Sequence, residues 1–242
     1  MINKIICTFL MALLFLFCSC DKVDLESYTF DSPNEYDTNL SSHDKYAVVL
    51  EDYKQLVKDL FSADFEDKVN NGYFTSPNED LSYDWFCMVI DAKKGLNDVS
   101  PSSFGYALYD INGDNCYELV LLREDYFVLA IYTIFDEEPT LLGAFSHKNK
   151  AYLLGDGEVC NFISESSGCF EYSFLQIDSK KLRQNKAYEK KDSCYYELTD
   201  GEEKAITEEE FIAKLSELPS VSDQTAIKEH MAAIGVVYTP CF

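Results

Sequence analysis

The chain has 242 residues, and its 43 acidic against 20 basic side chains give a formal net charge of −23. A negative field of this size repels nucleic acid and anionic lipid surfaces, so we expect no nucleic-acid partner. The 17 Tyr and 17 Phe residues favour half-exposed β-sheets, because an aromatic ring fits a pleated face.

The N-terminus has the pattern of an export signal. Lys4 precedes an apolar run over 5–17, which ends in Cys18-Ser19-Cys20. The run is shorter than the roughly 20 residues of a membrane-spanning helix and matches the apolar part of a secretory signal. Small residues before a cysteine resemble the lipobox of bacterial lipoproteins, which implies cleavage before Cys20 and lipidation of Cys20. An ordinary cleaved signal and an uncleaved anchor are the alternatives.

The resemblance divides the chain into three parts. Residues 1–19 are then a lipoprotein signal peptide, and the mature protein is attached through its lipid to the extracytoplasmic membrane surface of a bacterial cell envelope. Residues 20–41 are rich in Asp, Ser and Asn without a sustained hydrophobic period, which predicts a flexible tether. Residues 42–242 are long enough for a single domain.

Two helices are predicted before residue 100. The first follows Ser41 as its cap, and the second is announced by the sequence Ser-Pro-Asn-Glu over 76–79, a cap followed by a first-turn proline. Gly95 is a natural end for the second helix. Apolar residues at helical spacing form their buried faces. These are Tyr46, Leu50, Tyr53, Val57 and Leu60 in the first helix, and Leu81, Trp85, Met88 and Ala92 in the second.

From Phe104 to Leu198 the pattern indicates β-structure without a convincing helix. Asp156-Gly157 and Asp200-Gly201 are strong hairpin signals. The strands are therefore expected to be antiparallel and sequentially connected. They are predicted at 104–109, 118–122, 126–135, 140–145, 151–154, 158–163, 169–177 and 194–198.

Two further helices are predicted near the C-terminus. Thr207 and the three glutamates after it open one helix, and a shorter helix covers 223–231. The tail over 236–240 is expected to be extended. The order predicts an α+β fold with N-terminal helices, an antiparallel meandering β-sheet and C-terminal helices.

One turn in the β region carries metal-binding chemistry. Oxygen-bearing side chains stand at positions 1, 3, 5 and 9 of the turn, and a backbone carbonyl falls at position 7. Calcium takes six to eight oxygen ligands, so we expect a structural Ca²⁺ site. Gly113 and Asn115 tolerate the positive φ that such a turn needs. The expected ligands are Asp110, Asn112, Asp114, Cys116 through its carbonyl, and Glu118. The alternative is a turn whose side chains bond to its own backbone.

The turn resembles the D-x-[DN]-G-D-G-x-x-[DE] calcium loops of integrin-type propeller blades. Asn115 replaces the usual glycine, and Leu121 stands where an EF-hand would supply its last glutamate. A propeller is excluded because the motif occurs once. From Phe104 to Leu218 the chain is also similar to a family of uncharacterised bacterial secreted lipoproteins. That resemblance implies an N-terminal helix, one such turn and an antiparallel sheet.

Six cysteines remain after Cys20, an even number that permits three disulfides in an oxidising compartment. They are Cys87, Cys116, Cys160, Cys169, Cys194 and Cys241. Cys160 and Cys169 flank a turn-rich segment and are the first candidate pair. Buried free thiols are the alternative.

Signatures of nucleophile elbows, zinc proteases and phosphate loops are missing. We therefore expect a lipid-anchored binding or interaction module, with a glycan, peptide or protein as ligand. The alternatives are an envelope hydrolase with paired carboxylates and a purely structural envelope component.

Overall fold

The computed structural model describes residues 44–94, 98–166 and 168–242. The predicted signal peptide at 1–19, the lipidation site Cys20 and the tether at 20–41 lie outside these residues. Among the helices of the described residues, none has the length and the apolar character needed to cross a membrane.

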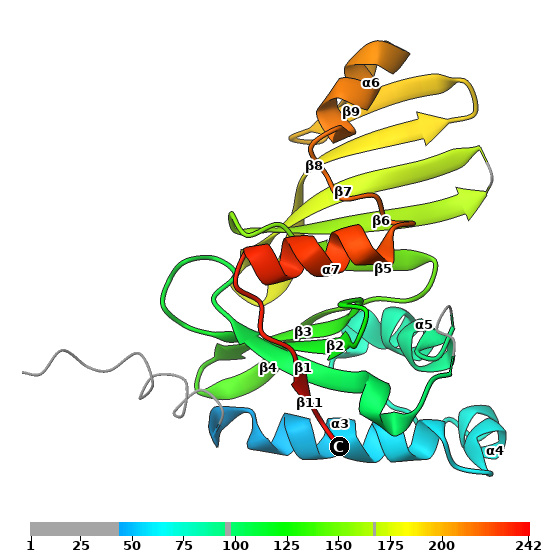
Figure 1. Ribbon diagram of the computed structural model, residues 1–242, viewed down its shortest axis with the longest axis vertical. Coiled ribbons are helices and arrows are strands. Elements are labelled where there is room, and N and C mark those ends of the chain that lie inside the picture. Colours follow the sequence, from blue (N-terminus) through cyan, green and yellow to red (C-terminus); the bar gives the residue numbers. More distant parts are fainter. Residues whose placement is uncertain (1–43, 95–97, 167) are drawn as a thin grey trace, which may run out of the picture. The chain divides into compact units, whose positions relative to one another are not determined.

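An antiparallel sheet of eleven strands dominates the described chain (Figure 1). The strand order is β10-β9-β8-β7-β6-β5-β3-β2-β1-β11, and β4 pairs with β3 beside this path. The strands are β1 Phe104–Tyr109, β2 Glu118–Arg123, β3 Val128–Phe135, β4 Glu138–Ala144, β5 Asn149–Leu153, β6 Glu158–Ser166, β7 Cys169–Asp178, β8 Lys181–Lys191, β9 Cys194–Thr199, β10 Glu202–Ile206 and β11 Thr239–Pro240.

Few helices accompany this sheet. They are α3 Ala47–Leu60, α4 Phe65–Asn70, α5 Ser82–Asp91, α6 Glu208–Leu215 and α7 Gln224–Ala233, with 3-10 turns η1 Glu79–Leu81 and η2 Pro101–Ser103. The expected α+β class, with N-terminal helices, a meandering sheet and C-terminal helices, is therefore wrong. The sheet is larger than expected because β8, β10 and β11 add polar or very short strands that carry no apolar alternation.

The meander is interrupted at β3. This strand pairs with β4 from Ala130 to Phe135, whereas β5 joins it at Val128 alone. The β3–β4 hairpin closes through Asp136 and Glu137, which have φ values of +49° and +69°. One edge of β3 pairs with β2, and the opposite edge pairs with both β4 and β5. The strand order of the sheet therefore passes from β3 to β5, and β4 lies beside it.

The first core lies between α3, α5 and strands β1 to β4. The predicted apolar face of α3 is buried there, and Tyr46 and Val57 are 0% exposed. Phe104 and Leu119 of the sheet belong to the same core and are also 0% exposed. The helical period of α3 was therefore predicted correctly, and it places this helix against the sheet.

The C-terminal helices α6 and α7 pack on strands farther along the sheet. Figure 1 shows α7 running across β5 and β6, and its Met231 is 0% exposed. Phe211 of α6 packs against the rings of Phe170 and Tyr195. Thr207 caps α6 as predicted, because its hydroxyl accepts the N–H of Glu210 at 3.1 Å.

Candidate functional site

The turn between β1 and β2 is organised around the carboxylate of Asp110. This carboxylate accepts backbone N–H bonds from Gly113 at 2.8 Å, Asp114 at 3.1 Å and Asn115 at 3.0 Å. Gly113 and Asn115 have φ values of +74° and +65°, which confirms the predicted backbone. The side chain of the first turn position therefore holds the loop in shape.

The next oxygen-bearing residues also bond within the turn. Asp114 accepts the N–H of Cys116 at 2.7 Å and the amide of Asn112 at 2.9 Å. Within the described ranges, the carbonyl of Cys116 accepts no hydrogen bond, and no three His, Cys, Asp or Glu side chains are grouped to hold a metal. The side-chain oxygens of Asp110, Asn112 and Asp114 thus already accept bonds within the turn, and the Cys116 carbonyl is the predicted ligand oxygen without one in the described chain.

Glu118, the ninth position, points into the fold and is 1% exposed. Its two oxygens accept the N–H of Ile111 at 2.9 Å and the hydroxyl of Thr133 at 3.2 Å. Burial raises the pKa of Glu118 to about 7; these hydrogen bonds oppose the shift, and the charges of Asp114 and Asp110 add to it. Its carboxyl therefore links the turn, through Ile111, to β3, through Thr133.

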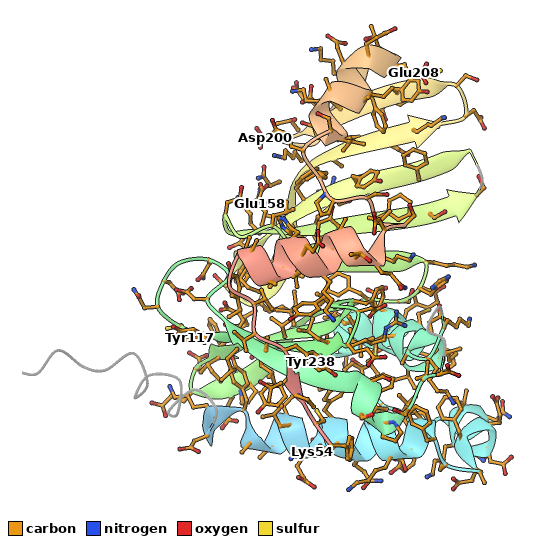
Figure 2. The ribbon with its side chains drawn as sticks, viewed as in Figure 1. Lys54, Tyr117, Glu158, Asp200, Glu208 and Tyr238 are labelled. Atoms are coloured by element: carbon orange, nitrogen blue, oxygen red, sulfur yellow. The ribbon has the colours of Figure 1, made fainter. Side chains whose placement is uncertain are left out.

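Tyr46 connects this turn to the start of α3. Its buried hydroxyl shares its proton between the carbonyls of Tyr117, at 3.1 Å, and Tyr132, at 3.3 Å. Tyr117, labelled in Figure 2, is the last residue of the turn before β2. The hydroxyl thus joins the predicted metal turn to Tyr132 of β3.

An open cavity of 510 Å³ lies between α3, the segment over 73–77, α5 and strands β2 to β4. We call it the α3 cavity. Its volume falls in the range of roughly 300–1,000 Å³ that small-molecule sites occupy. Five aromatic side chains line it: Tyr53, Tyr73, Phe74, Trp85 and Tyr132. The sequence did not predict this cavity. Its walls come from separate helices and strands, and the periodicity of each element predicts only which of its faces is buried.

Tyr132 brings a polar side chain to the wall of the α3 cavity. The residue is 4% exposed, and its hydroxyl has no hydrogen-bond partner in the described part of the chain. Burial raises the pKa of Tyr132 well above its usual value, and the nearby charge of Asp52 adds to the shift. Because this hydroxyl makes no bond within the described chain, it is available to an occupant of the cavity.

Two carboxylates share the wall formed by α3. Asp59 is 5% exposed and accepts bonds from Lys68 at 2.8 Å and from Gln55 at 3.1 Å. Asp52, two helical turns earlier, is exposed and has no ion-pair partner among the described residues. Asp59 is therefore neutralised by the protein, and Asp52 keeps its charge free for an interaction.

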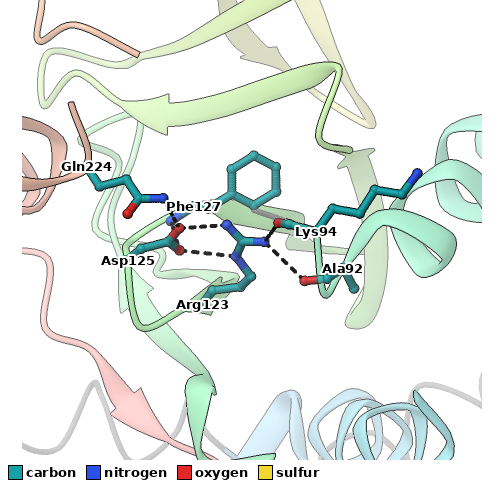
Figure 3. Close-up of polar contacts among 6 residues, drawn as sticks. All are labelled: Ala92, Lys94, Arg123, Asp125, Phe127 and Gln224. Carbon is teal, nitrogen blue, oxygen red and sulfur yellow. Dashed lines mark hydrogen bonds and ion pairs between the residues drawn. The ribbon is translucent and has the colours of Figure 1, made fainter. Parts of the chain in front are cut away.

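A second polar cluster surrounds Arg123 at the end of β2 (Figure 3). Its guanidinium donates to the carbonyls of Ala92 at 3.1 Å and Lys94 at 2.6 Å, and makes two bonds to Asp125, at 3.1 and 2.6 Å. Asp125 also accepts a bond from Gln224 at 3.4 Å. This cluster joins the end of α5, the β2–β3 turn and the start of α7, and we assign it a structural role.

The six cysteines of the described chain are free thiols, so the expected disulfides are not found. The β6–β7 register pairs Cys160 with Phe174 and Cys169 with Ser166. At about 3.3 Å per residue, the two cysteines are roughly 20 Å apart along the ladder, well beyond the ~7 Å that a disulfide allows. The long β-hairpin separates the predicted pair.

Comparison with protein-family models finds no matching family, and neither a curated protein nor a solved structure matches the chain. The resemblances drawn from the turn and the N-terminal signal therefore stay predictions.

Proposed function

We propose that this protein is a lipid-anchored binding module of the bacterial cell envelope and that the α3 cavity is its ligand site. The observation that carries the proposal is an open, aromatic-lined cavity whose wall includes Tyr132, a side chain without a hydrogen-bond partner in the described residues. The aromatic lining and the volume of 510 Å³ support a small-molecule ligand or the end of a larger chain, such as a glycan or peptide.

The ligand site can be tested through Trp85, the single tryptophan of the chain, which lines the cavity. A chemically diverse set of small molecules is added to the purified full-length protein, and Trp85 emission is recorded. Val49→Phe narrows the cavity, whereas Val48→Phe changes a neighbouring side chain that is 72% exposed. The proposal predicts binding that the first variant loses and the second retains. Binding that both variants retain would contradict it.

The anchor is proposed from the N-terminal sequence, where Cys20 follows the signal. Metabolic labelling with an alkyne-tagged fatty acid is expected to mark the protein and to fail in Cys20→Ser. Cys18→Ser is the matched control and is expected to be labelled. Labelling that survives in Cys20→Ser would place the lipid elsewhere.

We also propose that Ca²⁺ stabilises the β1–β2 turn through Asp110, Asn112, Asp114 and the Cys116 carbonyl. The fit rests on hard oxygen donors at alternate positions and on the Cys116 carbonyl, which has no other partner in the described chain. A role for Glu118 requires that one of its two present hydrogen bonds be exchanged for the ion.

Calcium binding is tested by thermal melting. With an affinity of about 10⁻⁴–10⁻³ M, 10 mM Ca²⁺ is expected to stabilise the fold by roughly 1.4–2.7 kcal/mol. Asp110→Ala and Asp114→Ala should lose this increase, whereas Asp136→Ala, in the exposed β3–β4 turn, should keep it. An equal increase in all variants would assign the effect to general screening.

A hydrolase with paired carboxylates has less support. The carboxylates that line the α3 cavity are Asp52 and Asp59, seven residues apart on one helix. Their backbones are therefore about 10 Å apart along the axis. Asp59 is also paired with Lys68. Hydrolysis needs an unpaired couple about 5–9.5 Å apart, so binding is the better account.

A further inference from the structure

The α3 cavity has a negative charge that no lining side chain balances. Its charged lining residues are Asp52 and Asp59, and Lys68 neutralises Asp59 at 2.8 Å. Asp52 has no ion-pair partner in the described ranges. The formal charge of the whole chain is −23, so the surrounding field also attracts cations.

The aromatic walls add to this preference. The face of an aromatic ring carries negative charge density and attracts a cation within about 6 Å of its centre. Lys68 illustrates the arrangement inside this protein, because its ammonium bonds to Asp59 and lies 5.5 Å from the centre of the Tyr73 ring. A carboxylate combined with an aromatic ring therefore already holds one ammonium group beside the cavity.

Tyr132 supplies the third component. The residue lines the cavity, its side chain has no hydrogen-bond partner among the described residues, and its hydroxyl oxygen can accept an ammonium N–H. We propose that the α3 cavity binds a small organic cation whose ammonium group meets Asp52 and Tyr132 and whose apolar body packs on the aromatic wall. This inference rests on the proposed function and names its ligand class.

The apolar part of the ligand follows from the remaining walls. Val49, Leu56 and Leu121 line the same cavity. A bare metal ion would leave these walls uncovered, whereas an aryl or alkyl group would remove their surface from water. The cavity volume of 510 Å³ accommodates such a molecule.

The test compares three probes of similar size and different charge: phenethylammonium, 2-phenylethanol and phenylacetate. Each is titrated into the purified full-length protein at constant ionic strength, and Trp85 emission reports binding. The proposal predicts that the cation binds about threefold to fivefold more tightly than the alcohol, the effect of one partly exposed charge pair. Phenylacetate is expected to bind most weakly.

Two substitutions locate the effect. Asp52→Asn is expected to reduce the preference for the cation over the alcohol to about one, because it removes the exposed charge pair. Glu51→Gln removes the same charge from an exposed neighbour outside the cavity lining and should leave the preference unchanged. Tyr132→Phe should weaken the binding of phenethylammonium in particular.

The outcomes separate the two proposals. Equal affinity for cation and alcohol, or a preference that Asp52→Asn retains, would overturn the cation assignment and leave the cavity as a binding site. Failure of all three probes would also overturn the cation assignment. The proposed function itself would be overturned only if, in addition, no molecule of the chemically diverse set showed binding that Val49→Phe removes.

Discussion

At the scale of single residues, Glu118 makes the stability of the fold depend on pH. Its ordinary pKa of 4.5 is raised to about 7 by burial in the native state. Between these values the native protein keeps a proton that the unfolded chain has released, so the contribution of Glu118 to stability is fully present below pH 4.5 and is lost as the pH rises through 7. The shift corresponds to roughly 3 kcal/mol.

Glu118→Gln should remove this dependence. Glutamine can accept from Ile111 and bond to Thr133 without carrying a charge, so the variant should keep its stability from pH 5 to 8 while the parent protein loses it. Urea unfolding with a calcium chelator at several pH values measures the effect. Glu138→Gln, at an exposed position of β4, is the control that retains the parent slope. Parallel slopes for the parent and Glu118→Gln would refute the assignment.

The turn around Asp110 could be identified from sequence because its chemistry is local. Asp110, Gly113 and Asn115 lie within six residues, and their turn bonds follow from their types and spacing. The α3 cavity could not be identified in this way. Trp85 lies on a helix and Tyr132 on a strand, and their approach depends on tertiary packing that no periodicity describes.

At the scale of elements, Gly105 determines how β11 joins the sheet. A Cβ atom at this position would lie 2.4 Å from the carbonyl oxygen of Thr239 and 2.6 Å from the ring of Tyr238. Gly105→Ala is therefore expected to cost about 1–3 kcal/mol and to release the tail. Hydrogen exchange at the Cys241 amide, which bonds to Phe104 at 3.0 Å, should become faster.

Gly168→Ala is the matched control for this prediction. The nearest atom to a Cβ at Gly168 is 3.9 Å away, so the substitution adds a methyl group without a clash. If hydrogen exchange at the Cys241 amide stays slow in Gly105→Ala, the pairing of β11 does not depend on the absence of a side chain at position 105.

Strands with an apolar pattern could be predicted, whereas polar strands could not. β1 lies at 104–109 as expected, because its apolar and aromatic residues define it. β8, Lys181–Lys191, has five lysine or arginine residues and no regular alternation. It forms because β7 and β9 pair with both of its edges, and a bulge between Phe174 and Leu175 shifts its register. These long-range hydrogen bonds are not visible in the local sequence.

At the scale of the whole molecule, Arg123 joins parts that are distant in the chain. It is 3% exposed and bonds to the carbonyls of Ala92 and Lys94 and to Asp125. Arg123→Lys keeps the charge but cannot make all these bonds, so it should lower the free energy of unfolding by about 2–3 kcal/mol. Urea unfolding measures the change. Arg183→Lys, at an exposed ion pair, should have almost no effect, and equal effects would contradict the assigned role.

The predicted α+β fold class was wrong because of how the strands assemble in the whole molecule. The order of N-terminal helices, meandering sheet and C-terminal helices predicted an α+β class, but the described chain forms one large antiparallel sheet with few helices. Polar β8 and β10 extend the sheet, and β4 leaves the meander. Their placement depends on pairing between strands, which a pass along the chain does not show.

If the α3 cavity holds the ligand of an anchored binding module, Trp85 in its wall should respond to binding. The most direct measurement is the NMR signal of the Trp85 indole, a single resonance because the chain has one tryptophan. A ligand from the diverse set is titrated into the full-length protein while its overall binding is followed by calorimetry. The indole resonance is expected to move in step with binding, and Val49→Phe is expected to abolish both changes. A ligand that binds by calorimetry and leaves the Trp85 resonance unmoved would contradict it.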